Sequence, residues 1–357
     1  MKRRDFFKLS AISILASRLS VYAQPFLFEP DTEQIRDSKI IKPKRLKEKS
    51  RIGIIAPASF ITKEDFEKIE QNLASLGLIA IPSRNLFKRF GYLGGNDVER
   101  VEDIHEMFAR KDIDGIMCAR GGYGTPRILR LIDYELIRKN PKVFIGYSDI
   151  TALLIAIFIK TGLVTFHGAV GISSFNDFTK KYFIDVLMEG KDFVEMESLP
   201  EEKNEEVSSI EGIFQINSGR AEGRLIGGNL SLLVNLIGTE FDFNLDEKIF
   251  FIEEVGEEPY RIDRMLTQLI NSRKLEKCRA IILGKFSNCE VKKENPSFRE
   301  SLNLREVLID RLGSLSIPVI YGLSFGHIKN KFTLPIGITS MIDVDRVKFA
   351  LVESSVV

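Results

Sequence analysis

A serine stands where an apolar run gives way to a helical pattern. In the segment VFIGYSDITALLIAIF, Ser148 ends the expected strand and opens the expected helix. Such a turn exposes the hydroxyl beside unpaired N–H groups, where negative charge is favoured. Gly146 gives the turn room, but Ile150 occupies the place of the second glycine of a nucleophile elbow. Ser148 is therefore a candidate nucleophile, and helix capping by Ser148 or Asp149 explains the segment equally well.

Three histidines could act as a general base near neutral pH. His105 lies in the polar helical stretch VERVEDIHEMFA and is predicted to be a surface residue. His167 ends the run LVTFHG and is expected in the same region as Ser148. His327 follows Gly326 in the loop GLSFGHIKNKFTLPIG, and loops on such scaffolds commonly hold functional groups. The residues alone favour His327 over His167 only slightly.

Two acidic residues end a very apolar run, KIFFIEEVGEEPYRIDRML. A carboxylate at the end of a buried strand is costly unless it is paired, so Glu253 needs a partner. Orienting an imidazole is one role for it, and a salt bridge to Arg261 or Arg264 is the alternative. The neighbouring Glu254 could serve in its place.

A glycine-rich turn, ARGGYGTPRIL, follows another apolar run. Gly121, Gly122 and Gly124 allow a close approach of the backbone to a ligand, and a helix beginning near Pro126 could turn N–H groups toward an anion. The turn could supply half of an oxyanion hole or bind a phosphate, although it lacks the lysine and Ser/Thr of a P-loop. Arg120 could pair with a substrate carboxylate or with an internal one.

Cysteine usage argues against a metal or disulfide framework. Cys118, Cys278 and Cys289 form no CxxC or His-rich pattern, so we expect no metal site and no cofactor. Cys118 lies in the apolar run GIMCAR and is predicted to be a buried small hydrophobe, with a catalytic cysteine as the remote alternative.

The elements around these residues alternate between short apolar strands and helices. The run RIGIIAPAS is predicted to be a buried strand, with Thr62 and Asp65 as a capping pattern for the next helix. Short all-apolar strands separated by helices indicate a parallel sheet covered on both faces. Further strands are expected at 78–83, 115–120, 143–147 and 163–168, and further helices near Val98, near Pro126 and at Asp149.

The second half carries a similar pattern and ends in two neighbouring strand-like runs, which we predict to form a β-hairpin. Strands are expected at 248–255, 279–286 and 318–324, the hairpin at 338–345 and 347–354, and helices at 229–238 and 261–270. We predict an α/β protein with an N-terminal Rossmann-like parallel-sheet domain at 51–188 and a smaller C-terminal α/β domain at 220–357. The acidic, weakly periodic segment 189–219 is predicted to connect them.

The composition, with 44% hydrophobic and 28% charged residues, is that of a soluble globular protein. The formal charge of +1 hides an asymmetry, because the first 23 residues carry five Lys or Arg against one Asp. The remainder holds 46 basic and 49 acidic residues and has no clustered basic face in its sequence. We therefore expect no nucleic-acid partner.

The N-terminal segment 1–23 is typical of a twin-arginine export signal. Arg3 and Arg4 precede a Phe pair and an apolar stretch, and Ala23 suits cleavage before Gln24. We predict an exported, periplasmic protein with a lead-in at 24–50 and no stable membrane span after processing. The alternative is a basic tail without a targeting role, in which case the protein is cytoplasmic.

Five separated motifs resemble those of the LD-carboxypeptidases, also called muramoyltetrapeptide carboxypeptidases. They are GYSD around Ser148, RGGYG before it, IGGNL around Asn229, EEVGEEPYRIDR with Glu253, and SFGH with His327. The resemblance runs from about Arg51 to the C-terminus, with the motifs in the family's order.

The resemblance implies a catalytic triad in which Ser148 attacks a peptide carbonyl, His327 takes its proton and Glu253 holds the imidazole. It also implies an oxyanion hole from the backbone N–H groups of Gly122 and Asp149, with Arg120 and Asn229 among the substrate-binding residues. Family members release the terminal D-alanine of muropeptide tetrapeptides without a metal, usually as dimers, so we expect a homodimer acting on such peptides. Many relatives work in the cytoplasm, which sets the export signal apart.

Two other functions fit the same residues. A relative of the microcin-immunity peptidases would cleave a peptidyl-nucleotide antibiotic, and an aromatic platform for adenine would favour it. A non-catalytic protein could instead bind an anion at the glycine-rich turn, with Ser148 acting only as a helix cap.

Overall fold

The computed structural model describes residues 40–199, 210, 212–292 and 294–357. They all belong to one compact unit, Asp37–Val357. The predicted leader 1–23 and most of the lead-in 24–50 lie outside the described residues, as does the most acidic part of the segment 189–219.

The first sheet confirms the predicted parallel arrangement. Five strands run parallel, and four of them are short apolar segments buried between layers, whereas β2 at the edge is partly exposed. They are β1 (Arg51–Ile55), β2 (Ile79–Pro82), β3 (Gly115–Cys118), β4 (Val143–Gly146) and β5 (Thr165–His167). A sixth strand, β12 (Leu334–Ile336), comes from the far end of the chain and pairs antiparallel with β5. The strand order is β12-β5-β4-β3-β1-β2.

The helices of this half are α2 (Lys63–Ala74), α3 (Asp97–Ala109), α4 (Tyr134–Lys139), α5 (Thr151–Thr161) and α6 (Asp177–Phe183). The predicted capping box is confirmed at the start of α2. The side chains of Thr62 and Asp65 each accept a hydrogen bond from the backbone N–H of the other residue. The helix expected near Pro126 was wrong. Two 3₁₀ turns stand there, Thr125–Arg127 and Leu129–Leu131, because Thr125 is tied to Asp149 instead of being capped as a helix start.

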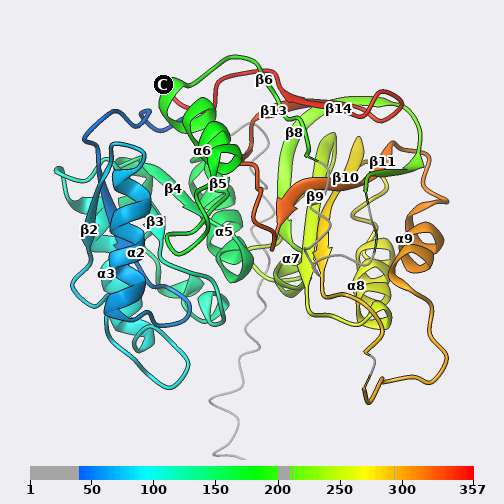
Figure 1. Cartoon of the computed structure of the whole chain (residues 1–357), viewed down its shortest axis with the longest axis horizontal. Coiled ribbons are helices and arrows are strands. Elements are labelled where there is room, and N and C mark those ends of the chain that lie inside the picture. Colours follow the sequence, from blue (N-terminus) through cyan, green and yellow to red (C-terminus); the bar gives the residue numbers. More distant parts are fainter. Residues whose placement is uncertain (1–39, 200–209, 211, 293) are drawn as a thin grey trace, which may run out of the picture. The chain divides into compact units, whose positions relative to one another are not determined.

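The second sheet has eight strands in the order β6-β14-β13-β8-β9-β10-β11-β7. Its parallel centre contains β8 (Arg220–Asn229), β9 (Lys248–Val255), β10 (Ala280–Ser287) and β11 (Val319–Gly326). The predicted hairpin is confirmed as β13 (Thr339–Asp343) with β14 (Lys348–Leu351). Helices α7 (Leu230–Leu236), α8 (Pro259–Asn271) and α9 (Leu304–Leu312) accompany these strands (Figure 1).

The segment 189–219 does more than connect the halves. Its described parts include β6 (Val194–Glu195) and β7 (Phe214–Asn217), which form the two edges of the second sheet. Strands this short carry too few residues for a visible hydrophobic alternation. The C-terminal sheet, expected in the smaller domain, therefore has more strands than the first.

Helix α5 joins the two sheets. Seven consecutive residues from Thr151 are fully buried. The Thr151 hydroxyl accepts a hydrogen bond from the backbone N–H of Asn229, 3.0 Å away at the end of β8. A Cβ on Gly228 would lie 2.5 Å from the Thr151 side chain, so glycine is required for this approach. The helix that follows Ser148 is thus packed directly against the second sheet.

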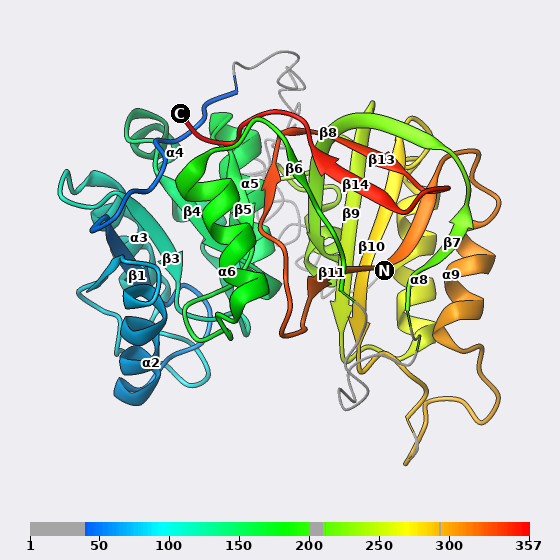
Figure 2. The ribbon, with the colours of Figure 1, turned by 45° about the horizontal axis from the view of Figure 1, so that its top comes forward.

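The chain end returns to the first half of the molecule. The backbone N–H of Arg45 donates to the carbonyl of Val357 at 2.9 Å, and the Val357 N–H donates to the carbonyl of Pro43 at 3.0 Å. Figure 2 follows this red segment from β14 to the marked C-terminus.

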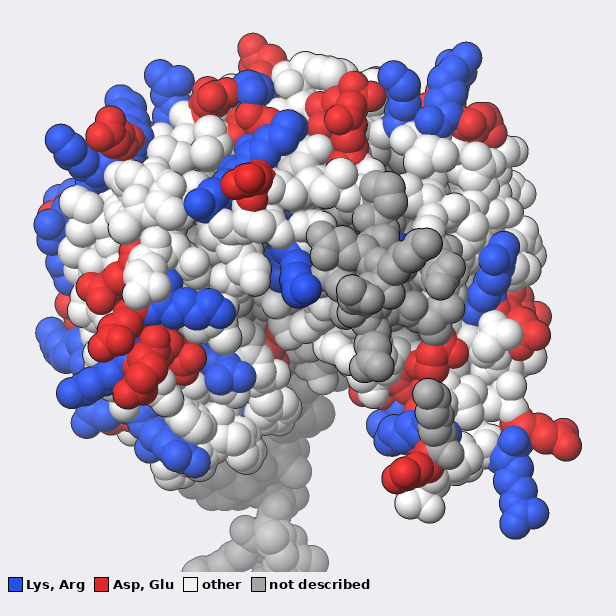
Figure 3. Space-filling view, in the orientation of Figure 1, with Lys and Arg blue, Asp and Glu red and all other residues white. Residues whose placement is uncertain are grey.

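Charges of both signs are interspersed on the face shown in Figure 3, with no broad area of one sign. Among the described residues, no helix has the length and apolar character needed to cross a membrane.

Candidate active site

Ser148 sits in a strained turn at the end of β4. Its φ is +65°, a conformation that residues other than glycine adopt rarely. A Cβ on Gly146 would lie 2.7 Å from the Ile150 side chain. Ile150 occupies the position of the second glycine of the elbow, and its side chain packs closely over Gly146. The strain holds the Ser148 hydroxyl out of the helix that follows it.

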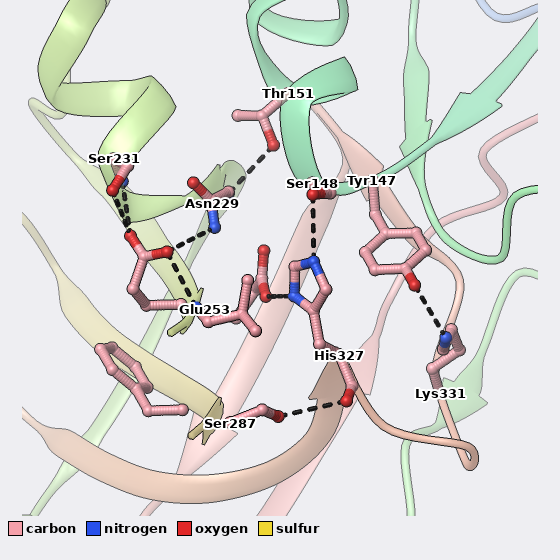
Figure 4. A network of polar contacts seen from close by, with 12 residues as sticks. Tyr147, Ser148, Thr151, Asn229, Ser231, Glu253, Ser287, His327 and Lys331 are labelled. Atoms are coloured by element: carbon pink, nitrogen blue, oxygen red, sulfur yellow. Dashed lines mark hydrogen bonds and ion pairs between the residues drawn. The ribbon is translucent and has the colours of Figure 1, made fainter. Parts of the chain in front are cut away.

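Three predicted residues form a chain of hydrogen bonds (Figure 4). Ser148 Oγ lies 3.0 Å from His327 Nε2, and His327 Nδ1 lies 2.8 Å from Glu253 Oε2. Because the carboxylate can only accept, Nδ1 donates to it and Nε2 accepts from the serine hydroxyl. This is the arrangement of a nucleophile, a base and an orienting acid.

Glu253 is fully buried in β9. Burial acts to raise its pKa, but the charge and hydrogen bond of His327 outweigh it and leave the pKa below the usual range. The alternative salt bridges of this carboxylate are not formed, since Arg261 pairs with Glu257 at 3.5 Å and Arg264 lies over the ring of Tyr260. Glu253 thus stays ionised against the imidazole.

The position of His327 is fixed by its neighbours. Ser287 at the end of β10 donates to the His327 carbonyl at 3.2 Å. Gly326 has a φ of +114°, and a Cβ there would lie 2.8 Å from the carbonyl oxygen of Lys285 and 3.2 Å from the Glu253 side chain. The close approach of β11 to the backbone of β10 and to Glu253 at this point therefore requires glycine.

Glu254 points away from His327, as expected for the next residue along a strand. It accepts hydrogen bonds from the Asn229 amide at 3.0 Å, from the Ser231 N–H at 2.8 Å and from the Ser231 hydroxyl at 2.7 Å. Asn229 also caps α7 by accepting from the N–H of Leu232. Asn229 is buried and is not among the residues lining the cavity described below, so its role in substrate binding stays a prediction.

The glycine-rich turn lies against the nucleophile. A Cβ on Gly121 would be 2.9 Å from Ser148 Cβ. Gly122 has a φ of +125°, and a Cβ there would be 2.1 Å from Ser59 Oγ. The turn therefore has no room for side chains at either position, and its backbone is held beside the Ser148 hydroxyl.

Asp149 fastens this turn to the nucleophile segment. Its buried carboxylate accepts from the Thr125 N–H at 2.8 Å, and the Thr125 hydroxyl donates to the Asp149 carbonyl. Burial raises the pKa of Asp149 above its usual range, against the opposing hydrogen bonds from Thr125. The sequence predicted a backbone role for Asp149, and this structural role of its side chain was missed.

The other two histidines are placed differently. His167 is buried against Tyr147 and Phe251, with ring centroids 6.1 and 5.4 Å away, and burial lowers its pKa to about 4. Its Nδ1 has no hydrogen-bond partner among the described residues. His105, predicted at the surface, is half-buried, and its Nε2 accepts from the Asp133 N–H at 2.8 Å. Of the three histidines, His327 is the one that contacts Ser148.

A cavity of about 530 Å³ opens beside Ser148 and His327. Its wall includes the predicted residues Arg120 and Gly122. It also includes Tyr147 and Lys331, which the sequence analysis missed, although each lies within four residues of a triad member. The lining residues are Arg120, Gly121, Gly122, Tyr147, Ser148, Val170, Ile172, Ser173, Ser174, His327, Ile328, Lys329 and Lys331.

The acidic, histidine and cysteine residues of the described part of the chain are dispersed, and its thiols are buried. This part contains no group of three or more His, Cys, Asp or Glu that could hold a metal ion. Cys118, Cys278 and Cys289 are all buried, and burial raises the pKa of each thiol. A thiol with a raised pKa is a poor nucleophile at neutral pH, so Cys118 acts as a core residue.

Two family models match this chain. Residues 52–168 match the LD-carboxypeptidase N-terminal domain, and residues 222–342 match the LD-carboxypeptidase C-terminal domain. The chain belongs to the LD-carboxypeptidase family. It is therefore a peptidase of the hydrolase class, and the fold predicted from the family motifs is confirmed.

Relatives of this LD-carboxypeptidase carry two kinds of name. A Bacillus subtilis (strain 168) protein named "Probable murein peptide carboxypeptidase" is 39% identical over 88% of this chain and 95% of its own length. The solved structure of a muramoyltetrapeptide carboxypeptidase from Oxalobacter formigenes has a TM-score of 0.72 and 30% identity, covering 85% of this chain and 98% of its own. The Microcin C7 self-immunity protein MccF of Escherichia coli is 33% identical over 84% of this chain and 91% of its own length.

Proposed function

We propose that this protein is a serine LD-carboxypeptidase that removes the terminal D-alanine from peptidoglycan tetrapeptides. The observation that carries the proposal is the chain of hydrogen bonds from Ser148 through His327 to Glu253 at the wall of a cavity. The names of its murein-directed relatives support the substrate class.

In the proposed reaction, Ser148 Oγ attacks the carbonyl carbon of the bond before the terminal D-alanine, and its proton moves to His327 Nε2. Glu253 stabilises the imidazolium and keeps Nδ1 as the donor. The backbone N–H groups of Gly122 and Asp149 are proposed to stabilise the oxyanion. His327 then returns the proton to the departing amine, leaving an ester on Ser148. Water, deprotonated by His327, cleaves this ester and restores the serine hydroxyl.

The direct test is incubation with a defined tetrapeptide followed by mass spectrometry of the products. The expected products are the tripeptide and free D-alanine, with Ser148→Ala as the inactive control. A serine-directed phosphonate should label wild type at Ser148, as peptide mapping would show. A folded wild-type protein that neither releases D-alanine nor takes the label would exclude a serine peptidase, and would leave the anion-binding alternative.

A second candidate is the cleavage of a peptidyl-nucleotide antibiotic. It is favoured by the similarity to MccF, whose solved structures include complexes with adenosine monophosphate and aspartyl sulfamoyl adenosine. Against it, Tyr147 supplies the aromatic ring of the described cavity wall, and this ring packs against His327 with centroids 5.0 Å apart. Competition between a tetrapeptide and an aminoacyl sulfamoyl adenosine distinguishes the two, since the proposed enzyme should prefer the peptide.

We also propose that the protein is exported through residues 1–23. The support is the pair Arg3-Arg4 before an apolar stretch. Changing both to Lys should retain the protein in the cytoplasm, whereas the unchanged chain should yield a periplasmic form beginning at Gln24. Detection of the intact leader on cytoplasmic protein alone would contradict export.

We also propose that the protein forms a homodimer, because members of the family are usually dimers. Light scattering after gel filtration should give twice the chain mass of 40.5 kDa, or less if the leader has been removed. A monomer at micromolar concentration would contradict it.

A further inference from the structure

Positively charged side chains line the cavity beside Ser148. Among its described lining residues are Arg120, Lys329 and Lys331, and none of the other lining residues is Asp or Glu. Arg120 Nε is buried without a hydrogen-bond partner among the described residues. A cavity of this kind favours a ligand with negative charge.

Lys331 is the most enclosed of these cations. It stands four residues after His327, where its backbone N–H donates to Thr179 Oγ1 at 3.2 Å. The residue is only 5% exposed. Its ammonium lies 3.4 Å from the Tyr147 hydroxyl and 4.5 Å from the centre of the Tyr147 ring. Figure 4 shows the Tyr147 ring next to His327, with its hydroxyl turned toward Lys331.

These contacts leave the ammonium under-satisfied. It has three N–H donors, and among the described residues it makes a single long hydrogen bond, to a neutral phenol. Burial lowers the pKa of Lys331 to about 8, while the charge of Glu253 acts in the opposite direction. A buried charge is costly unless it is paired, and such groups in a cavity commonly belong to a functional site. The missing partner is therefore expected to arrive with a ligand.

We propose that Lys331 binds a carboxylate of the peptide substrate and so selects which bond reaches Ser148. The inference rests on the proposed function and deepens it. The bond that a carboxypeptidase cleaves lies one residue from a free α-carboxylate, so that charge must enter the cavity beside the nucleophile. The Tyr147 ring, adjacent in sequence to Ser148, contacts both His327 and Lys331 and so places the ammonium close to the catalytic residues.

Two substrate groups share this chemistry, namely the α-carboxylate of the leaving D-alanine and the side-chain carboxylate of a diaminopimelate at position three. Four tetrapeptides separate them, with a free acid or an amide at the C-terminus and with diaminopimelate or lysine at position three. Loss of the Lys331 effect with the amide would identify the α-carboxylate, and its loss with lysine would identify the side chain.

The test compares Lys331→Met with wild type on these peptides. Met keeps the length of the side chain and removes the buried charge, so the variant is expected to fold. For the peptide with both carboxylates, kcat/KM should fall by about 10- to 1000-fold, chiefly through KM, as for removal of one member of a buried charge pair. Lys331→Arg should recover part of this loss. For the peptide that lacks the recognised carboxylate, wild type and Lys331→Met should be equal within about threefold.

Tyr147→Phe is the matched control for a purely structural role. It removes the hydroxyl contact with Lys331 and keeps the ring against His327, so the preference for the carboxylate should persist. Equal losses by Lys331→Met on all four peptides, or no loss on any, would overturn the inference.

Binding measured in the Ser148→Ala background makes the test independent of turnover. Calorimetry should give tighter binding of the peptide that carries the recognised carboxylate, and Lys331→Met should abolish that difference. If wild type fails to cleave the peptides but the Ser148→Ala protein still discriminates between them, the proposed function fails and the carboxylate site stands. If the Ser148→Ala protein binds all four equally or none, the carboxylate site is refuted.

Discussion

The two sheets contribute to the active site by different means. The first presents Ser148 through local backbone geometry, with a φ of +65° and glycine at positions 146 and 121 to make room. The second presents Glu253 and His327 through strand pairing, because these residues lie 74 positions apart in the sequence. They meet where β9 and β11 flank the end of β10.

The two halves of the molecule must therefore preserve different structural features to keep the site intact. A nucleophile set by local geometry depends on a few adjacent residues and on the turn packed against it. A base and an acid set by sheet pairing depend on the whole second sheet being formed in register. Substitutions in each half should therefore affect the site in different ways.

The largest effect is expected from breaking the chain of hydrogen bonds at either side. Ser148→Ala and His327→Ala should each lower kcat by about 10⁴-fold or more, because the members of a triad act as one unit. The double variant should lose little beyond the worse single variant. D-alanine release measures this, and thermal unfolding shows whether each variant is folded. Multiplicative losses in the double variant would mean that the two residues act separately.

Next, Glu253→Gln should lower kcat by about 10³- to 10⁴-fold, since a neutral amide no longer holds the imidazole in the right tautomer. Its matched control is Glu254→Gln on the same strand. Glu254 accepts hydrogen bonds from Asn229, Ser231 and Val255, so that variant should lose about 1–3 kcal/mol of stability but less than tenfold in kcat. Similar kcat losses in both variants would refute the assignment of Glu253 as the orienting acid.

The same division between local and tertiary contacts decides which elements the sequence could predict. The apolar runs that form β1 to β5 and the capping box at Thr62 were visible because their signals are local. β8 was missed because glycines interrupt its hydrophobic pattern, and β12 because it has three residues and pairs with a strand far away in sequence. The helix expected at Pro126 failed because a tertiary contact with Asp149 overrode the local pattern.

In the site, Ser148 could be proposed from its own segment. The choice of His327 over His167 depended on the family motifs, since both histidines end or follow a strand and only tertiary structure distinguishes their partners. Lys331 lies in none of the motifs, and Tyr147 lies within GYSD without any sign in the sequence of a role for its side chain. Their significance lies in burial and in the cavity, which a sequence does not display.

A smaller effect is expected from crowding the nucleophile. In Gly121→Ala, the new Cβ would lie 2.9 Å from Ser148 Cβ and 3.1 Å from its hydroxyl, so kcat/KM should fall by about 10- to 100-fold through displacement of the serine. Gly53→Ala is the control, because its Cβ would crowd the Met107 side chain in the first core, 2.6 Å away, at no cost to the site. Gly53→Ala should lower stability and leave kcat/KM within threefold. An unchanged Gly121→Ala enzyme would show that the turn does not confine Ser148.

The smallest effect on activity is expected at His167, where the second histidine should matter for stability alone. The pKa of His167 is about 4 in the folded protein and returns toward 6.5 on unfolding. The unfolded chain therefore binds the extra proton between these values, and stability falls as the pH drops from about 6.5 to 4. At about 1.4 kcal/mol per pH unit, this contributes about 3 kcal/mol at most.

Phe at position 167 fits the aromatic contacts with Tyr147 and Phe251 and cannot titrate. Urea unfolding at pH 7 and pH 4.5 should give a smaller stability difference for His167→Phe than for wild type, with kcat within about threefold at pH 7. An identical difference in both proteins would mean that His167 is not the buried titrating group, and a large loss of kcat would restore it as a rival to His327.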